Sequence, residues 1–162
     1  MISYTFILSL FPIFISTFLI EKKDRVKRIK TSKEIMKFLI PKKEIKKIEE
    51  IILYATNKTE NISFNLNDLI YISSQGNYAS FFIKTDSEIK EIILRNTLSA
   101  IIKELNKYNN IIRCHKSYII NTNYVNAISG NARGYYLRSN SITQQIPVSR
   151  SFNKLDLQKM VI

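Results

Sequence analysis

The sequence has very little of what metal binding and covalent catalysis most often require. Its 162 residues include one cysteine, Cys114, and one histidine, His115. An intramolecular disulfide is therefore impossible, and a single Cys and a single His cannot form a zinc cluster. The Gly-rich patterns GxxxxGK[ST] and GxGxxG do not occur, so no phosphate-cradling loop is visible. With three Gly and three Pro, the chain is also neither collagen-like nor a low-complexity linker.

A catalytic arrangement is not visible among the remaining polar residues either. Cys114 and His115 are neighbours in an apolar run that predicts a strand, and adjacent side chains of a strand point to opposite faces. They cannot form the hydrogen-bonded pair that activates a thiol, and we predict that Cys114 is a small buried hydrophobe. The acidic residues of the C-terminal part fall in turns or at solvent-facing positions without an evident partner. We therefore expect no enzyme, no small-molecule substrate and no cofactor.

Charge is absent from the first twenty residues, MISYTFILSLFPIFISTFLI, although the whole chain carries a formal net charge of +12. A helix of about 20 residues crosses the hydrocarbon core of a bilayer. The next segment, EKKDRVKRIK, holds six Lys and Arg residues, and the positive-inside rule places it in the cytoplasm. We predict a single-pass helix over residues 1–20 in the inner (cytoplasmic) membrane, with lipid contact over residues 1–30.

Two other interpretations of this apolar segment stay open. A cleaved signal peptide has its positive charge before the apolar run, whereas here the charge follows it. A buried helix of a soluble protein normally has a polar face, and residues 1–20 have none. The position of Met1 at the edge of the run also fits a shortened relative of a protein with more spans.

Residues 21–56 form a second, basic region. Residues 21–50 hold 12 Lys and Arg against 6 Asp and Glu, a net charge of +6. From residue 31 to residue 56 the apolar side chains recur at near-helical spacing, interrupted at Pro41. We therefore predict a basic juxtamembrane helical linker, close to an anionic lipid surface. A short coiled coil and thus a homodimer are compatible with it, but the heptads are too few to define one.

The character of the sequence changes at about residue 57. Apolar runs rich in Ile, Tyr and Phe alternate with Asn, Gly, Ser and Asp, a pattern typical of strands and turns. The predicted strands are 62–66, 69–73, 78–84, 88–94, 111–114, 124–129, 134–138 and 141–148. One helix interrupts them, capped by Asn96 or Thr97 and ending near Lys107, and a short helix lies within residues 152–161. Residues 57–162 are therefore predicted to form a mainly β, antiparallel domain with one small packed helix.

One segment of this domain combines donors with apolar strand residues. In IIRCHKSYIIN (111–121), the donors Arg113, His115, Lys116 and Ser117 stand at the end of an apolar run. Such a strand-to-loop edge can present donors to phosphates and base edges of nucleic acid. The alternative is structural, with His115 satisfied in the interior and Arg113 paired at the surface.

The run RCHKSYIIN resembles the central signature of the LytTR DNA-binding domain, Arg-x-His-[Arg/Lys]-Ser-Tyr followed by two hydrophobic residues and Asn. Four further segments resemble this family in the same order, over about residues 60–160. They are DLIY with the later GNY (68–78), RNTL (95–98), ISGNARGY (128–135) and IPVSRSF (146–152). The resemblance implies a transcription regulator with an elongated antiparallel β domain that binds double-stranded DNA, often at direct repeats.

The resemblance also implies which residues contact the DNA. Family members place loop side chains, and not a recognition helix, in successive major grooves. By motif position, Lys116 contacts a base edge or a phosphate in one groove and Arg150 does so in another, where Arg can bind guanine in bidentate fashion. Asn77 or Tyr78 occupies the place of a third contact. Four further residues are implied to orient the loops or hold phosphates, and they are His115, Ser117, Asn121 and Ser149. Arg113, from the donor run described above, is a further candidate for DNA contact.

Most relatives carry a phosphorylatable receiver domain before the DNA-binding domain, and the first 56 residues are too few for one. The input signal is therefore not defined by the sequence. Two other functions stay open, namely a membrane-tethered protein-interaction module without DNA binding and an RNA-binding protein.

Overall fold

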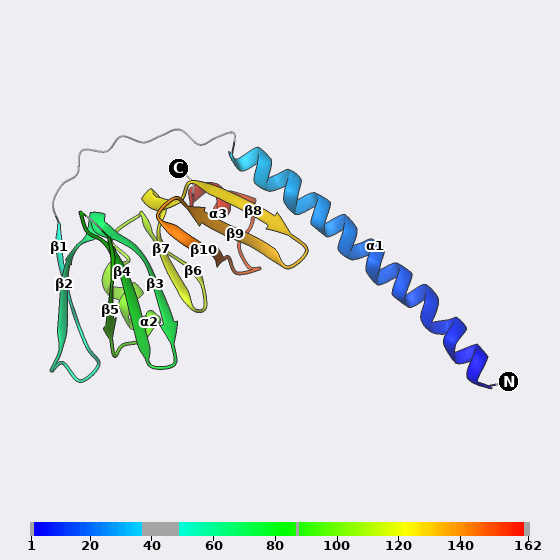
Figure 1. The fold of residues 1–162 in the computed structure, drawn as a ribbon, viewed down its shortest axis with the longest axis horizontal. Coiled ribbons are helices and arrows are strands. Elements are labelled where there is room, and N and C mark those ends of the chain that lie inside the picture. Colours follow the sequence, from blue (N-terminus) through cyan, green and yellow to red (C-terminus); the bar gives the residue numbers. More distant parts are fainter. Residues whose placement is uncertain (1, 37–48, 87, 161–162) are drawn as a thin grey trace.

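A computed structural model describes residues 2–36, 49–86 and 88–160, without the side chains of residues 1–14, 35, 36, 143, 154 and 159. A long N-terminal helix, α1 (Ile2–Met36), projects from a body built mainly of strands (Figure 1). The strands are β1 (Glu50–Tyr54), β2 (Asn61–Asn65), β3 (Leu69–Gln75), β4 (Tyr78–Lys84), β5 (Ile89–Leu94), β6 (Ile111–His115), β7 (Tyr118–Asn121), β8 (Ala127–Asn131), β9 (Gly134–Ser139) and β10 (Ile142–Pro147). Two short helices accompany them, α2 (Leu98–Leu105) and α3 (Lys154–Lys159).

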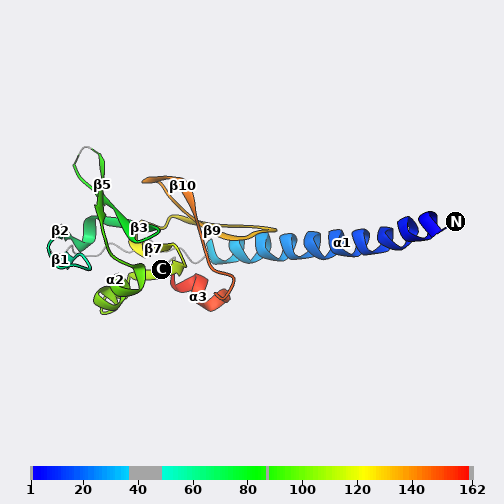
Figure 2. The same ribbon diagram turned by 90° about the horizontal axis from the view of Figure 1, so that it is seen from below.

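The described strands form three sheets, and every pairing in them is antiparallel. The central sheet has the order β5-β4-β3-β7-β6, with the hairpin β1-β2 at one end of the body and the sheet β10-β9-β8 at the other. Seen from below, α2 and α3 lie on the same side of the strands (Figure 2). This arrangement confirms the prediction of a mainly antiparallel β domain with small packed helices.

Two apolar clusters hold the sheets together, and β3 contributes to both. Leu69 and Ile72 pack into the first cluster, with the β1-β2 hairpin and α2. Ile70 and Tyr71 pack into the second, with β8, β9, β10 and α3. The pairing of β3 with β4 shifts register between Leu69 and Tyr71, which is why two adjacent residues serve the same cluster. Since each buried Ile or Leu contributes about 1.5–3 kcal/mol, the second cluster fixes the β8-β9-β10 sheet against the central one.

Helix α2 forms where the sequence predicts it. The side chain of Thr97 caps it by accepting a hydrogen bond from the main-chain N–H of Ala100 (3.2 Å). Leu98, Ile101 and Leu105 recur at helical spacing and are buried in the first cluster. The amphipathic pattern therefore predicted both the helix and the face that it buries.

The predicted helical linker is wrong at its C-terminal end. Residues 50–54 form strand β1, in which exposed and buried residues alternate and Ile51 and Leu53 face the first cluster. β1 pairs with β2 from Glu50 to Tyr54, so the apolar residues follow the period of a strand. Residues 37–48, including Pro41, lie outside the described residues, and the helix predicted there stays a prediction.

Strand β7 is a further difference from the prediction. Tyr118–Asn121 is an apolar run of four residues directly after a turn, too short to show a period of its own. It pairs with β3 and with β6, and thereby occupies an interior position of the central sheet.

The N-terminal helix is continuous through the segment predicted to leave the membrane. Among the residues that the structure describes, no helix is both long and apolar enough to cross a membrane. The predicted span over residues 1–20 falls mostly on residues 1–14, whose side chains lie outside the described ones. The membrane helix therefore stays a prediction that rests on the sequence.

Asn121 is fully buried where β7 ends, and its side-chain amide joins three segments. Its Nδ2 donates to the main-chain oxygens of Leu66 (3.3 Å) and Leu69 (2.9 Å). Its Oδ1 accepts from Asn110 Nδ2 (3.0 Å) and from the main-chain N–H of Asn123 (3.1 Å). This network ties β3 to the end of β7. Asn121 therefore stabilises the fold, and its buried side chain is not available for a DNA contact.

We expect Asn121→Ala to lower the free energy of unfolding by about 2 kcal/mol or more, because buried carbonyls lose their donors. The matched control is Asn109→Ala, since Asn109 is exposed and its replacement is expected to stay within about 0.5 kcal/mol of wild type. Chemical denaturation followed by circular dichroism measures both. An Asn121→Ala chain as stable as the control contradicts the structural role.

Candidate nucleic-acid interface

The turn between β6 and β7 places Lys116 at the surface. His115 pairs with Tyr118, so Lys116 and Ser117 are the two residues of a tight turn. The main-chain N–H of Ser117 donates to His115 Nδ1 (3.2 Å), which folds the His115 ring against the turn. Lys116 is exposed, and its amino group extends from a backbone that is fixed on both sides.

Arg113 holds this turn from within β6. Its Nη2 donates to the main-chain oxygen of Lys116 (3.1 Å), and its Nη1 donates to Ser99 Oγ (2.8 Å) on α2. The guanidinium therefore links the turn to the helix packed behind it. This geometry assigns Arg113 a positioning role, because two of its five N–H donors hold the turn and α2 together.

The segment that follows β10 brings Arg150 to the same place. The main-chain N–H of Val148 donates to the oxygen of Tyr135 (2.9 Å), and that of Ser149 donates to the oxygen of Cys114 (2.8 Å). The second bond ties the end of the β10 segment directly to β6. Arg150 is the next residue and is exposed.

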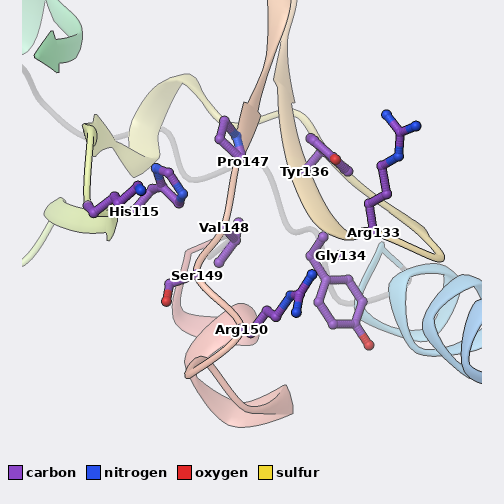
Figure 3. Close-up of a pocket in the computed structure, with 10 residues that line it drawn as sticks. His115, Arg133, Gly134, Tyr136, Pro147, Val148, Ser149 and Arg150 are labelled. Carbon is purple, nitrogen blue, oxygen red and sulfur yellow. The ribbon is translucent and has the colours of Figure 1, made fainter. Parts of the chain in front are cut away.

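These segments enclose a groove of about 450 Å³ (Figure 3). It is lined by His115, Lys116, Arg133, Gly134, Tyr135, Tyr136, Pro147, Val148, Ser149 and Arg150. The side chains come from the β6-β7 turn, from the β8-β9 hairpin and from the segment after β10. In the described part of the chain, no acidic residue lines this groove, while three cationic residues do. The groove therefore suits an anionic ligand.

A second turn lies beside the β6-β7 turn, at the same end of the central sheet. Gln75 pairs with Tyr78, which leaves Gly76 and Asn77 as the turn residues, and Gly76 has a φ of +62° that suits glycine. The main-chain N–H of Ser74 donates to the oxygen of Ser117 (3.0 Å), so the two turns are adjacent. Asn77 and Tyr78 are exposed there, outside the groove.

The residues predicted for DNA contact thus fall into three groups. Four of them line the groove, and they are His115, Lys116, Ser149 and Arg150. Two are exposed on the neighbouring turn, and they are Asn77 and Tyr78. The others support the loops from within the protein, and they are Arg113, Ser117 and Asn121.

Arg133 is a groove residue that the sequence did not single out. It lies in the β8-β9 turn, within the ISGNARGY segment that resembles the family. The residues next to Arg133 in the sequence do not distinguish it from an ordinary solvated turn residue. Its position beside the other cations depends on the packing of two sheets, which a linear motif does not encode.

Cys114 and His115 are the two side chains that nucleophilic catalysis would use, and burial shifts the pKa of both. Burial raises the pKa of the Cys114 thiol to about 12, so the thiol is protonated at neutral pH and is a poor nucleophile. Burial, followed by the charge of Lys116, lowers the pKa of His115 below its ordinary value. No group of three His, Cys, Asp or Glu residues that could hold a metal occurs in the described segments.

Comparison with known proteins identifies the domain. The family model of the LytTr DNA-binding domain matches residues 59–160. The chain therefore belongs to the LytTR family, whose domains bind DNA and are not enzymes. No curated protein matches the chain.

Among solved structures, the chain is similar to the LytTr DNA-binding domain of a protein described as a methyl-accepting/DNA response regulator from Bacillus cereus. The identity is 19 % and the TM-score is 0.48, over 70 % of this chain and 96 % of that one.

His115 is the single histidine of the chain, so protonation near its pKa can be followed without interference from a second one. Since its pKa is lowered in the folded state, the unfolded chain takes up a proton first as the pH falls through about 6.5. We expect the free energy of unfolding to be constant above this pH and to fall below it. Denaturant titrations at several pH values between about 5.5 and 7.5 measure this dependence.

The control is His115→Asn, which keeps an acceptor for Ser117 and does not titrate in this range. The variant is expected to lose the dependence. A wild-type chain whose stability rises as the pH falls through this window contradicts the assignment.

Proposed function

We propose that this chain is a sequence-specific transcription regulator that reads the major groove of double-stranded DNA with loop side chains. The observation that carries the proposal is the groove in which Lys116 and Arg150 lie together, although 33 residues separate them in the sequence. Membership of the LytTR family indicates that the ligand is DNA, because domains of this family bind DNA.

The chemistry of the groove fits both parts of DNA recognition. Arg150 presents a planar guanidinium, which binds guanine O6 and N7 in bidentate fashion. Lys116 contacts a base edge or a phosphate, and Ser149 and His115 provide neutral donors for phosphate oxygens. On the adjacent turn, Asn77 and Tyr78 reach the next part of the duplex. We infer that the two turns and the segment after β10 contact the DNA together.

The charge of the domain fits a reader of sequence. Residues 51–162 hold 13 Lys and Arg against 7 Asp and Glu, a net charge of +6. This excess attracts a duplex, and the few positioned donors of the groove then distinguish one sequence from another. A homodimer on direct repeats is the arrangement that we propose for the bound state.

The test selects binding sites from a random duplex library with the full chain, at two salt concentrations. Wild type, Lys116→Ala and Arg150→Ala are compared. We expect wild type to enrich one repeated motif and Arg150→Ala to lose about 1–3 kcal/mol of discrimination at part of it. The matched control is Lys84→Ala, an exposed cation at the opposite end of β4 from the turns, which is expected to enrich the wild-type motif.

Uniform retention of all sequences by all four chains contradicts base readout. Better competition by single-stranded RNA than by duplex DNA favours RNA binding. Absence of duplex binding favours a protein-interaction module.

We also propose that residues 1–20 anchor the chain in the inner (cytoplasmic) membrane, with the DNA-binding domain in the cytoplasm. Support comes from the sequence alone, through the uncharged run and the six cationic residues directly after it. Contact of residues 1–30 with anionic lipid follows from the same charges.

Membrane fractionation with alkaline extraction tests the anchor. We expect the full chain to stay in the membrane pellet, and the double variant Ile13→Lys, Ile15→Lys to be released. Release of the wild-type chain into the soluble fraction contradicts the anchor and leaves the DNA-binding proposal untouched.

A further inference from the structure

Helix α1 lies against the DNA-binding domain around Arg28, outside the region that the family model matches. It packs mainly on β8. Ser32 is buried there, at 4 % exposure. A Cβ atom at Gly130 of β8 would lie 2.7 Å from the main-chain oxygen of Arg28, so only glycine allows this approach. The helix and the β8-β9 hairpin are thus in close backbone contact.

The Arg28 side chain holds the β8-β9 turn. Its Nη1 donates to the main-chain oxygens of Asn131 (3.3 Å) and Ala132. From the other side, Asn131 Oδ1 accepts from the main-chain N–H groups of Arg133 (2.8 Å) and Gly134 (3.2 Å). The residue directly before Arg133 is therefore fixed by α1, and Arg133 itself is fixed by the turn.

Arg133 connects two hollows of the surface. It lines the groove that holds Lys116 and Arg150, and it also lines an adjoining hollow of about 410 Å³. The second hollow is lined further by Arg25 and Glu21 of α1, together with Asn131, Ala132, Tyr136 and Gln145. Two arginines, Arg25 and Arg133, stand against one carboxylate, Glu21, in this lining, so the net positive charge continues from the groove towards α1.

We propose that Arg133 is a further DNA contact, to a backbone phosphate beside the bases read by Arg150, and that Arg28 of α1 positions it. The inference rests on the proposed function. An exposed arginine loses less conformational freedom on binding when its backbone is already fixed, which is the contribution of Arg28. The N-terminal helix and the DNA interface are in this way one coupled unit, and displacement of α1 weakens DNA binding.

The test measures binding of the full chain to its selected duplex as a function of salt. We expect Arg133→Ala to weaken binding several-fold for all sequences alike, and to lower the salt slope by about one unit. Arg28→Ala is expected to give the same two changes in smaller or equal measure. In the double variant the two effects are not additive, because Arg28 acts through Arg133.

Two further variants separate positioning from charge. Lys30→Ala removes a charge from an exposed position two residues on, around the opposite side of α1, and is expected to leave affinity and slope unchanged. Gly130→Ala keeps every charge but adds a methyl group against the Arg28 backbone, and is expected to match Arg28→Ala. Since unfolding lowers the active fraction without altering the salt slope, the slope distinguishes lost contact from lost fold.

Each outcome decides one claim. A wild-type chain that binds no duplex overturns the proposed function and this inference with it. Wild-type binding that Arg133→Ala leaves unchanged overturns this inference alone. Additive losses for Arg28 and Arg133 show that Arg28 acts independently, which overturns the coupling.

Discussion

The arrangement of the candidate DNA interface depends on the joint between the central sheet and the β8-β9-β10 sheet. The main-chain N–H of Ser149 donates to the oxygen of Cys114, and this bond lies over the second apolar cluster. Lys116 belongs to one sheet and Arg150 follows the other, so their separation is fixed only if this joint is rigid. Burial of Ile70, Ile128 and Ile146 behind the bond provides that rigidity.

The polar residues around the joint have two roles. Some form hydrogen bonds that hold the turns in place, and others are exposed on those turns. The guanidinium of Arg113 donates to the turn that carries Lys116, and the amide of Asn121 ties the other end of β7 to the start of β3. The same division exists at the β8-β9 turn, where Arg28 donates to main-chain oxygens and Arg133 is exposed. Exposed cations on rigid turns are what readout by loops requires, because flexible side chains on flexible loops lose more entropy on binding.

Much of the fold could be predicted from local patterns. Strand β4 has the bounds that alternation predicted, 78–84, and α2 begins after the predicted cap at Thr97. Strand β1 could not be predicted, because Ile48, Ile51 and Ile52 also fit helical spacing and only pairing with β2 decides between the two. Strand pairing is a contact between two segments, and the spacing of apolar residues within one segment does not predict it.

The residues of the candidate interface that lie in the RCHKSYIIN and PVSR motifs could be predicted from the sequence. The residues that pack beside them could not. The segment 113–121 and the PVSR segment carry recognisable signatures, and the structure brings both to one groove. Arg133 lies in the ISGNARGY segment, for which no DNA contact was predicted, and its environment depends on Arg28, 105 residues earlier in the chain. Long-range packing of this kind becomes visible only in three dimensions.

In the proposed function, Lys116 and Arg150 read different parts of one DNA site from two segments held at a fixed separation. The most direct measurement replaces each base pair of the selected site in turn and determines the affinity of wild type, Lys116→Ala and Arg150→Ala for every duplex. We expect each variant to lose discrimination at its own base pairs, by about 1–3 kcal/mol for Arg150→Ala, and to keep it at the others. Equal weakening of every duplex by both variants, with discrimination intact, would contradict it.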